Sequence, residues 1–262
     1  MYDFELVKPG SVAEAASAIA GEDAQALGGG QTLIPTMKQR LASPTTLVSL
    51  TGVAGMQGVS ESGGTVSIGG ATTHATVAAE AGAYYPALAA LASHIGDPAV
   101  RNRGTIGGSL ANNDPSACYP AGALGSGATI VTNSREIAAD DFFQDLFETA
   151  LGEDEIITEV RFPVPQAAHY EKFNQPASRF ALTGVFVARY ADGVRVAVTG
   201  ASENGVFRWT EAEAALNKEF RTDALMGLNI NHLNMIGDLH GSKEYRAHLV
   251  SVLTKRAILA AT

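Results

Sequence analysis

Apolar and polar residues alternate between helical and strand spacing along the first 55 residues. Ser11 followed three residues later by Glu14 is typical of a helix N-terminus, and the alanine-rich run behind it stops at Gly21. A strand, a glycine turn, a helix and a second strand then follow, which indicates a small βαβ-like unit. The predicted elements are a helix over 12–20, a strand over 24–27, a helix over 33–41 and a strand over 45–50.

Residues 56 to about 163 mix the two patterns. The predicted elements are strands over 64–70, 127–133 and 155–163, with helices over 74–81 and 85–95. Between the helices and the later strands lies RNRGTIGGSLANNDPSACYP, residues 101–120, which is dense in turn and loop residues. We expect this segment to be irregular, and an irregular segment of that length inside a domain is usually functional.

Pro163 and Pro165 indicate a boundary, after which the pattern changes again. Two alternating runs, over 180–190 and 193–202, predict an antiparallel hairpin. Helical spacing returns in the last part of the chain, over 209–217 and 242–261. We therefore expect a small α+β unit at the C-terminus.

Composition and charge narrow the classes of protein that fit. The chain has 262 residues, 46% of them apolar and 17% charged, as expected for a globular protein with a sizeable core. Its net charge of −9 argues against a nucleic-acid or anionic-membrane surface. The single cysteine, Cys118, excludes an internal disulfide and an iron–sulfur or zinc–thiolate site built from this chain alone.

The start of the chain and its apolar runs bear on its location. MYDFELVKPGS lacks the basic-then-apolar order of a signal peptide, and no run approaches the roughly 20 apolar residues that cross a bilayer. We expect a cytoplasmic protein without a transmembrane segment. A partner's signal would still allow export or attachment to a membrane through that partner.

Two glycine-rich segments are the candidates for chemistry. Gly28, Gly29 and Gly30 stand between a predicted strand and a predicted helix, where bare backbone N–H groups and the helix dipole suit an anion. The segment is neither a Walker A loop nor a G-x-G-x-x-G motif, and taken alone it is better explained as a tight turn that needs positive φ. The second segment, residues 105–109, again pairs adjacent glycines with flanking hydroxyls. Two phosphate-binding segments favour a pyrophosphate, and hence a dinucleotide, over two unrelated turns.

The motifs also resemble a known family. GGGQTLIPTMKQRL is similar to the A-G-G-Q-S-L-L-P-x-M-K-x-R-L segment of the FAD-binding medium subunits of molybdenum hydroxylases, the family of carbon monoxide dehydrogenase, xanthine dehydrogenase and aldehyde oxidoreductase. RNRGTIGGSLANNDPSA resembles the second motif of that family, with T-I-G-G-S at its centre. The resemblance continues through DEIITEVRFP, YEKFNQPASRFALTGVFVA, TGASENGVF and DLHGSKEYRAHLV, and so covers nearly the whole chain.

The resemblance implies an α+β fold with three parts. Residues 1–55 and 56–163 would be the two lobes of an FAD-binding domain of the vanillyl-alcohol-oxidase (PCMH) type, and 164–262 the C-terminal flavoprotein domain. The pyrophosphate would be bound from one side by Gly28, Gly29, Gly30, Gln31 and Thr32, and from the other, near the ribityl chain, by Thr105, Ile106, Gly107, Gly108 and Ser109. Asp114 belongs to the second motif, Ile157 would pack on the adenine or the flavin, and Lys172 would lie near the isoalloxazine.

Three residue positions depart from the family pattern. Gly28 replaces an alanine and should add only flexibility. Thr32 replaces a serine but keeps the hydroxyl. Cys118 stands where many relatives have an acidic residue for the adenosine ribose, so that contact would fall to a backbone group or to Asp114. No histidine lies in either glycine motif, so we expect FAD to be bound non-covalently, and the scattered histidines do not suggest a metal site.

The function implied is electron transfer rather than substrate chemistry. The chain would be the FAD subunit of a molybdenum hydroxylase, with iron–sulfur clusters on a small subunit and the molybdenum cofactor on a large one. The resemblance implies that the complex is a dimer of heterotrimers. It would take electrons from those clusters and pass them to a small-molecule or protein acceptor, so it needs no catalytic acid or base of its own. Two alternatives stay open at this point: a self-contained FAD oxidase, and a non-catalytic nucleotide-binding assembly subunit that a redox titration would distinguish.

Overall fold

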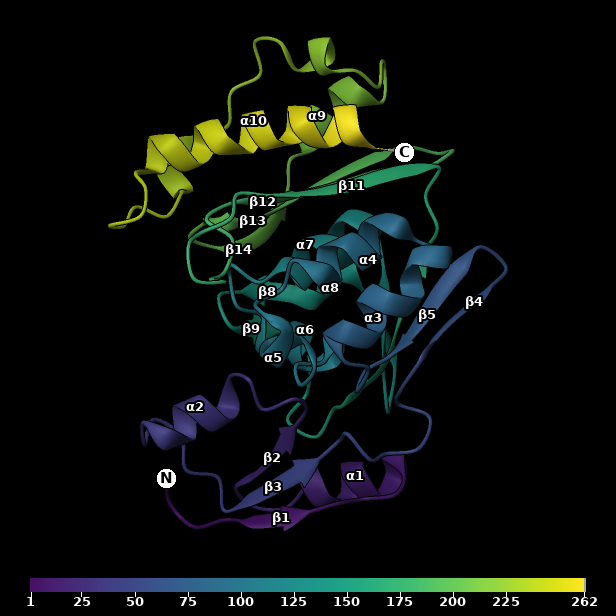
Figure 1. Cartoon of the computed structure of the whole chain (residues 1–262), viewed down its shortest axis with the longest axis vertical. Coiled ribbons are helices and arrows are strands. Elements are labelled where there is room, and N and C mark those ends of the chain that lie inside the picture. The colour runs from purple at the N-terminus through teal and green to yellow at the C-terminus, as the bar shows by residue number, and fades with distance from the viewer. Residues whose placement is uncertain (262) are drawn as a thin grey trace.

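Three larger β-sheets follow one another along the long axis of the molecule (Figure 1), and a fourth has only two strands. A computed structural model describes residues 1–261. The N-terminal sheet lies at one end, the C-terminal helix lies at the other, and the second sheet with its helices lies between them. The mixture of sheets and helices is the expected α+β class.

The first sheet is parallel, with the order β1-β3-β2. Its strands are β1 (Glu5–Val7), β2 (Ala24–Leu27) and β3 (Thr46–Ser49), and its helices are α1 (Val12–Ile19) and α2 (Leu33–Lys38). The Ser11 hydroxyl accepts the N–H of Glu14 at the start of α1, as the sequence predicts. The strand–helix–strand unit is confirmed, but α2 ends at Lys38. Leu41 lies beyond it and is 75% exposed, so it does not extend the apolar face.

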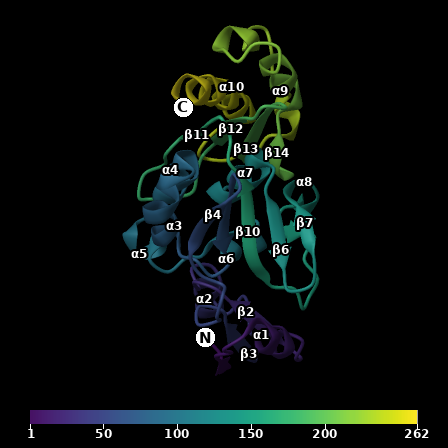
Figure 2. The ribbon, with the colours of Figure 1, turned by 90° about the vertical axis from the view of Figure 1, so that its right-hand side faces the viewer.

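The second sheet is antiparallel, with the order β4-β5-β10-β6-β7. Its strands are β4 (Val59–Ser62), β5 (Thr65–Gly69), β6 (Thr129–Thr132), β7 (Glu136–Ala138) and β10 (Ile157–Pro163). The accompanying elements are α3 (His74–Glu80), η1 (Ala81–Ala83), α4 (Pro86–Ser93), α5 (Pro98–Arg101), α6 (Ile106–Asn112), α7 (Cys118–Ser126), α8 (Ala139–Phe142) and the short hairpin β8 (Phe143–Asp145) and β9 (Glu148–Thr149). Figure 2 shows β4, β10, β6 and β7 across the middle of the molecule.

The expectation of an irregular segment over 101–120 is wrong, because α6 and α7 occupy much of it. Thr105 starts α6 by accepting the N–H of Gly108 at 3.2 Å. Every residue of α7 is buried, although this helix contains two glycines and a proline. Tertiary packing therefore outweighs the low helix propensity of these residues.

The third sheet is antiparallel and runs in chain order from β11 to β14. Its strands are β11 (Ala167–Lys172), β12 (Gly184–Arg189), β13 (Val194–Ser202) and β14 (Gly205–Arg208), and its helices are α9 (Thr210–Leu216), η2 (Thr222–Leu225), η3 (His232–Asn234) and α10 (Lys243–Ala260). The predicted hairpin is confirmed, with Arg189 opposite Val194. Both predicted C-terminal helices form, and α10 covers the outer face of the sheet (Figure 1).

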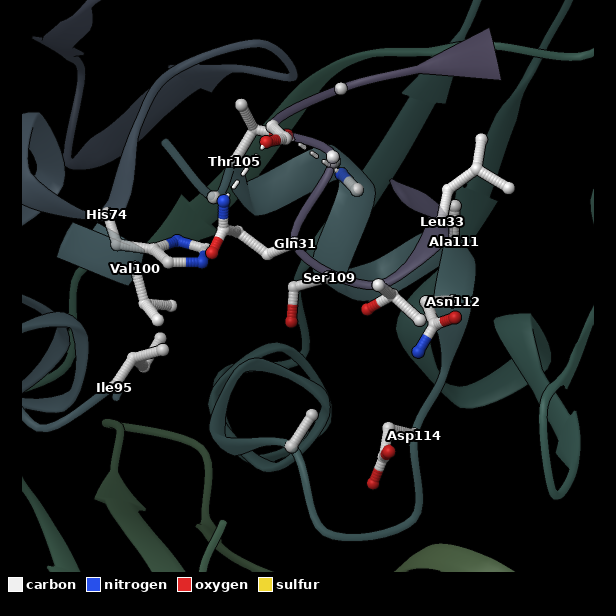
Figure 3. A pocket seen from close by; sticks show the side chains of 18 of the residues that line it. Gln31, Leu33, His74, Ile95, Val100, Thr105, Ser109, Ala111, Asn112 and Asp114 are labelled. Atoms are coloured by element: carbon white, nitrogen blue, oxygen red, sulfur yellow. Dashed lines mark hydrogen bonds between the residues drawn. The ribbon is translucent and has the colours of Figure 1, made fainter. Parts of the chain in front are cut away.

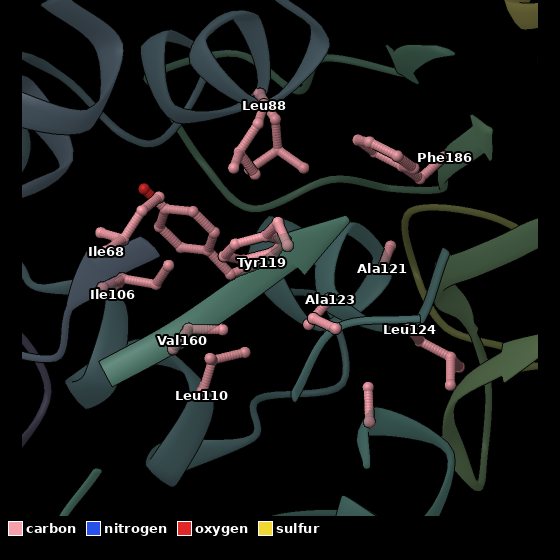
Figure 4. Packing of buried hydrophobic residues seen from close by; sticks show 14 of the residues in the cluster. Ile68, Leu88, Ile106, Leu110, Tyr119, Ala121, Ala123, Leu124, Val160 and Phe186 are labelled. Carbon is pink, nitrogen blue, oxygen red and sulfur yellow. The ribbon is translucent and has the colours of Figure 1, made fainter. Parts of the chain in front are cut away.

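One core joins the second sheet to the third through the helices between them (Figure 4). Tyr119 of α7 is fully buried, as are Leu88 of α4, Ile68 of β5 and Phe186 of β12. The large helix layer thus fixes the position of β11 and β12 relative to the residues of the second glycine segment. Among the described residues, no helix is long and apolar enough to cross a bilayer.

Candidate functional site

A cavity of about 1060 Å³ lies where the first sheet, the helices of the second sheet and the loops of the third meet (Figure 3). Its volume is at the upper end of the range of ligand pockets. Both glycine segments line it, together with most of the other residues singled out from the sequence. These lining residues are Gly28, Gly29, Gly30, Gln31, Thr32, Thr105, Gly107, Gly108, Ser109, Asp114, Ile157 and Lys172.

Ile106 is the exception among the sequence-predicted site residues. Its side chain is fully buried in the central core, and the cavity wall does not include it. Its backbone N–H donates to the Thr72 carbonyl at 3.1 Å. The first residue of α6 therefore faces the core and offers the cavity neither a side chain nor a free donor.

The first glycine segment keeps its backbone donors free. Within residues 1–261, the N–H groups of Gly29, Gly30, Gln31 and Thr32 have no acceptor in the chain. The Thr32 hydroxyl does not cap α2 either. A loop with this many unpaired N–H groups in front of a helix suits a phosphate, because anions take up unpaired donors and favour the positive end of the helix dipole.

The second glycine segment has already used the backbone donors of residues 106–109. Gly107 donates to the Gly70 carbonyl at 2.9 Å, Gly108 to the Thr105 hydroxyl at 3.2 Å, and Ser109 to the Thr105 carbonyl at 3.0 Å. What this segment presents to the cavity is the exposed backbone of Gly108 and the Ser109 hydroxyl, which points into the cavity in Figure 3. The two segments are therefore not equivalent phosphate-binding loops.

The glycines also let the two segments approach each other. A Cβ on Gly29 would collide with the carbonyl of Arg103, and its distance to the Cα of Gly104 would be 2.5 Å. A Cβ on Gly28 would lie 2.7 Å from the Thr105 hydroxyl. Real Cβ atoms do not approach other atoms so closely, so bare backbone at Gly28 and Gly29 holds the first loop against the second.

Three further predicted residues lie in the cavity wall. Asp114 follows α6, and its carboxylate accepts the N–H of Ser116 at 2.8 Å; burial raises the pKa of this carboxyl despite that bond. Lys172 ends β11 and donates to the carbonyl of His94 at the end of α4, at 2.8 Å. Ile157 begins β10 and is buried. These residues surround the cavity from three different elements.

Cys118 also lines the cavity, where it is 4% exposed. Burial raises the pKa of its thiol, which outweighs the opposing effect of the nearby Lys172 ammonium. The thiol is therefore protonated near neutral pH and cannot replace the negative charge of an acidic residue at this position. The sequence-based interpretation of Cys118 as a small packed residue agrees with its burial.

His74 is a cavity residue that the sequence analysis did not identify. It begins α3 and is 5% exposed, and burial, assisted by the charge of Arg101, lowers its pKa from 6.5 to about 4. An isolated bridge between Thr73 and Thr105 brings the start of α3 beside the start of α6. The sequence contains no signal for that pairing, because the two threonines lie on separate helices with two others between them.

The loop between β11 and β12 contributes a second group that the sequence analysis missed. The cavity is also lined by Gln175, Ala177, Ser178, Arg179 and Phe180. Ala177 and Ser178 have φ values of 61° and 58°, a left-handed conformation that is uncommon for residues other than glycine. Consecutive strained residues at a cavity are typical of ligand-binding loops.

The fold and the site define a class of protein. Two glycine segments, one before α2 and one at the start of α6, face one large cavity. Free N–H donors on one side and hydroxyls on the other fit a dinucleotide. Residues 2–165 match the family model of the FAD-binding domain in molybdopterin dehydrogenase. Because the match covers more than half of the chain, the chain belongs to this family.

Individual relatives extend the likeness over the whole chain. It is 36% identical to the nicotine 6-hydroxylase medium subunit of Paenarthrobacter nicotinovorans, over 97% of this chain and 95% of that one. It is 32% identical to the carbon monoxide dehydrogenase medium chain of Hydrogenophaga pseudoflava, over 98% and 96%. Its structure matches carbon monoxide dehydrogenase from that organism with a TM-score of 0.86 at 31% identity, covering 99% of this chain and 97% of that one. Quinoline 2-oxidoreductase from Pseudomonas putida 86 gives a TM-score of 0.87 at 28% identity, covering 98% and 96%.

Proposed function

We propose that this chain is the FAD-carrying, electron-transferring medium subunit of a molybdenum hydroxylase complex. The observation that carries the proposal is the cavity between the two glycine segments, whose free donors, hydroxyls and volume fit FAD. Bound FAD would supply the redox chemistry, because a flavin accepts electrons singly and releases them singly or in pairs. The protein's part is to hold, orient and shield it.

The proposed roles of the residues follow from what each offers the cavity. The N–H groups of Gly29, Gly30, Gln31 and Thr32 would bind the pyrophosphate, with Gly28 allowing the close approach to the second segment. From the other side, Ser109 and Thr105 would add hydroxyls beside Gly107 and Gly108. Asp114, Ile157 and Lys172 would complete the wall around the nucleoside and flavin ends. Ile106 supports the second segment through the core and has no proposed contact with the cofactor.

We also propose a division into three functional parts. Residues 1–55 and 56–163 would form the two lobes of the FAD-binding domain, and 164–262 the C-terminal flavoprotein domain. The positions of the three larger sheets support these boundaries, since each proposed part contains one of them. The end of the family match at residue 165 falls beside the second boundary.

The proposed partners are an iron–sulfur small subunit and a molybdenum-binding large subunit, assembled with this chain as a dimer of heterotrimers. This proposal is supported by the medium-subunit and medium-chain names of the relatives. Electrons would enter from the clusters of the small subunit and leave to an external acceptor. The proposed compartment is the cytoplasm, or a membrane surface reached through these partners.

Redox titration of the bound cofactor tests the proposal. The full chain, purified with FAD, is expected to show a reversible flavin reduction, and the flavin in the assembled complex is expected to be reduced when the substrate of the complex is added. Flavin that binds but is never reduced through the partner subunits would contradict an electron-transfer role and favour a non-catalytic nucleotide-binding subunit.

A further inference from the structure

His74 lies in the cavity wall and has a buried polar atom that forms no hydrogen bond with the described chain. Its Nδ1 is buried, and within residues 1–261 it has no hydrogen-bond partner. Ile95 and Val100 lie beside it on the same side of the cavity (Figure 3). An unpartnered polar atom among apolar neighbours lowers the stability of the folded chain. With an apolar residue of similar size at this position, the FAD-free protein should therefore be at least as stable.

The ring lies where the two glycine segments meet. The backbone N–H of His74 donates to the carbonyl of Gly104 at 2.9 Å, and a Cβ on Gly104 would lie 2.5 Å from Nε2 of the ring. Gly104 is also the residue against which Gly29 packs. On its other side the ring packs on Tyr119, with the ring centroids 5.3 Å apart and the planes at 48°. The position of the imidazole is therefore fixed by elements of the site.

We propose that His74 is a positioning residue for FAD, and that Nε2 of its imidazole, the ring nitrogen that the chain does not fully enclose, hydrogen-bonds the bound cofactor where the two glycine segments meet. This inference rests on the proposed function, because it needs FAD in the cavity. An uncharged imidazole offers one donor and one acceptor. It therefore suits an uncharged polar group of FAD, such as a hydroxyl of the ribityl chain or a polar atom of the flavin ring, rather than a phosphate.

Direct titration of the full chain with FAD tests this role, with binding monitored by flavin fluorescence and absorbance. Thermal unfolding of the FAD-free protein is measured in parallel. The variants are H74L, which removes the polar atoms, and H74N and H74Q, which place an amide near Nδ1 and Nε2 respectively. The matched control is Y119F. Tyr119 packs on His74 and also has a buried, unpartnered hydroxyl, but it does not line the cavity.

We expect H74L to bind FAD about tenfold more weakly than the wild type, the loss of one hydrogen bond. The FAD-free H74L protein should unfold at the same temperature as the wild type or higher, because an unpartnered polar atom is gone. One of the two amide variants should recover most of the affinity. Y119F should bind FAD as the wild type does.

Two results would overturn the inference while leaving the proposed function intact. One is unchanged FAD affinity in H74L. The other is a loss of affinity in H74L that accompanies a lower unfolding temperature of the FAD-free protein and that neither amide variant restores, which is the signature of a purely structural role. Failure of the wild type itself to bind FAD, alone and with partner subunits, would instead overturn the proposed function.

Discussion

The two glycine segments are similar in sequence but contribute to the cavity in different ways. Residues 28–32 form an open loop whose backbone donors have no acceptor in the described chain. Residues 105–109 begin a helix, and the N–H groups of 106–109 are already paired. The first segment is thus equipped to bind a ligand through its backbone. The second supplies hydroxyls and a surface against which the first packs.

Glycines of both segments also serve the fold, by allowing close approaches between parts of the chain. At Gly107, bare backbone allows α6 to pack on Gly70, the residue after β5, since a Cβ there would lie 2.6 Å from the Gly70 carbonyl oxygen. At Gly29, it allows one lobe to touch the other. Neither close approach is with a ligand, although both determine the shape of the cavity.

Gly29→Ala should have the largest effect of the changes considered. The added methyl collides with the backbone of Arg103 and Gly104, which cannot move aside as a flexible side chain would. Overpacking of this kind costs about 1–3 kcal/mol, and FAD binding should be lost because the first loop is displaced. Thermal unfolding and FAD titration measure the two effects.

Gly52→Ala is the matched control for that change. Nothing lies within 4 Å of a Cβ at Gly52, and its φ is not positive, so stability and FAD binding should stay close to those of the wild type. Equal behaviour of the two alanine variants would contradict the close packing of the lobes.

Gly107→Ala and Gly108→Ala should differ in their effect on stability, although the two glycines are adjacent in the second segment. A Cβ at Gly107 meets backbone, whereas one at Gly108 meets only the Thr105 hydroxyl, at 3.0 Å. We expect Gly107→Ala to lower the free energy of unfolding by about 1–3 kcal/mol. Gly108→Ala should be nearly neutral, because alanine favours the helix. Chemical denaturation measures both, and the reverse order would exclude a packing role for Gly107.

Thr105→Val and Thr32→Val compare the hydroxyls of the two segments. The Thr105 hydroxyl caps α6, so its removal should cost about 1 kcal/mol of stability even without FAD. The Thr32 hydroxyl does not cap α2, so Thr32→Val should leave the FAD-free protein unchanged and weaken FAD binding by several fold. Equal losses of stability in the two variants would contradict the claim that only the Thr105 hydroxyl stabilises the FAD-free fold.

A further effect should be a pH dependence that originates at His74, beside the second segment. Its pKa is lowered from 6.5 to about 4, chiefly by burial, so the unfolded chain takes up a proton in this interval and the folded chain does not. The wild type should therefore lose stability relative to His74→Leu as the pH falls from 6.5 to 4, and the difference should level off below 4. Denaturation of both proteins at several pH values measures it. A constant difference across this range would contradict a buried, uncharged His74.

The sequence predicted the periodic elements well, because their apolar positions carry a clear spacing. β2 and the hairpin of β12 and β13 form where the pattern places them. α6 and α7 were missed because glycine, asparagine and proline normally favour loops. Here burial along the whole of α7 stabilises a helix that propensity alone would not.

Most of the cavity wall was also predictable, but only where a motif marked it. The two glycine segments and Asp114 were found through local sequence, whereas His74 enters the wall through the pairing of Thr73 with Thr105. Ile106 shows the opposite case, since it lies inside a motif and yet faces the core. The side of a helix that faces a ligand depends on tertiary packing, which the adjacent residues in the sequence do not reveal.

The flavin content of the purified full chain tests the central claim most directly. After saturation with FAD and removal of the excess, we predict a yellow protein with one flavin per chain, released intact when the protein is denatured because the binding is non-covalent. Gly52→Ala should retain this flavin and Gly29→Ala should lose it. A colourless wild-type protein that does not take up FAD, even in the presence of its partner subunits, would contradict the account.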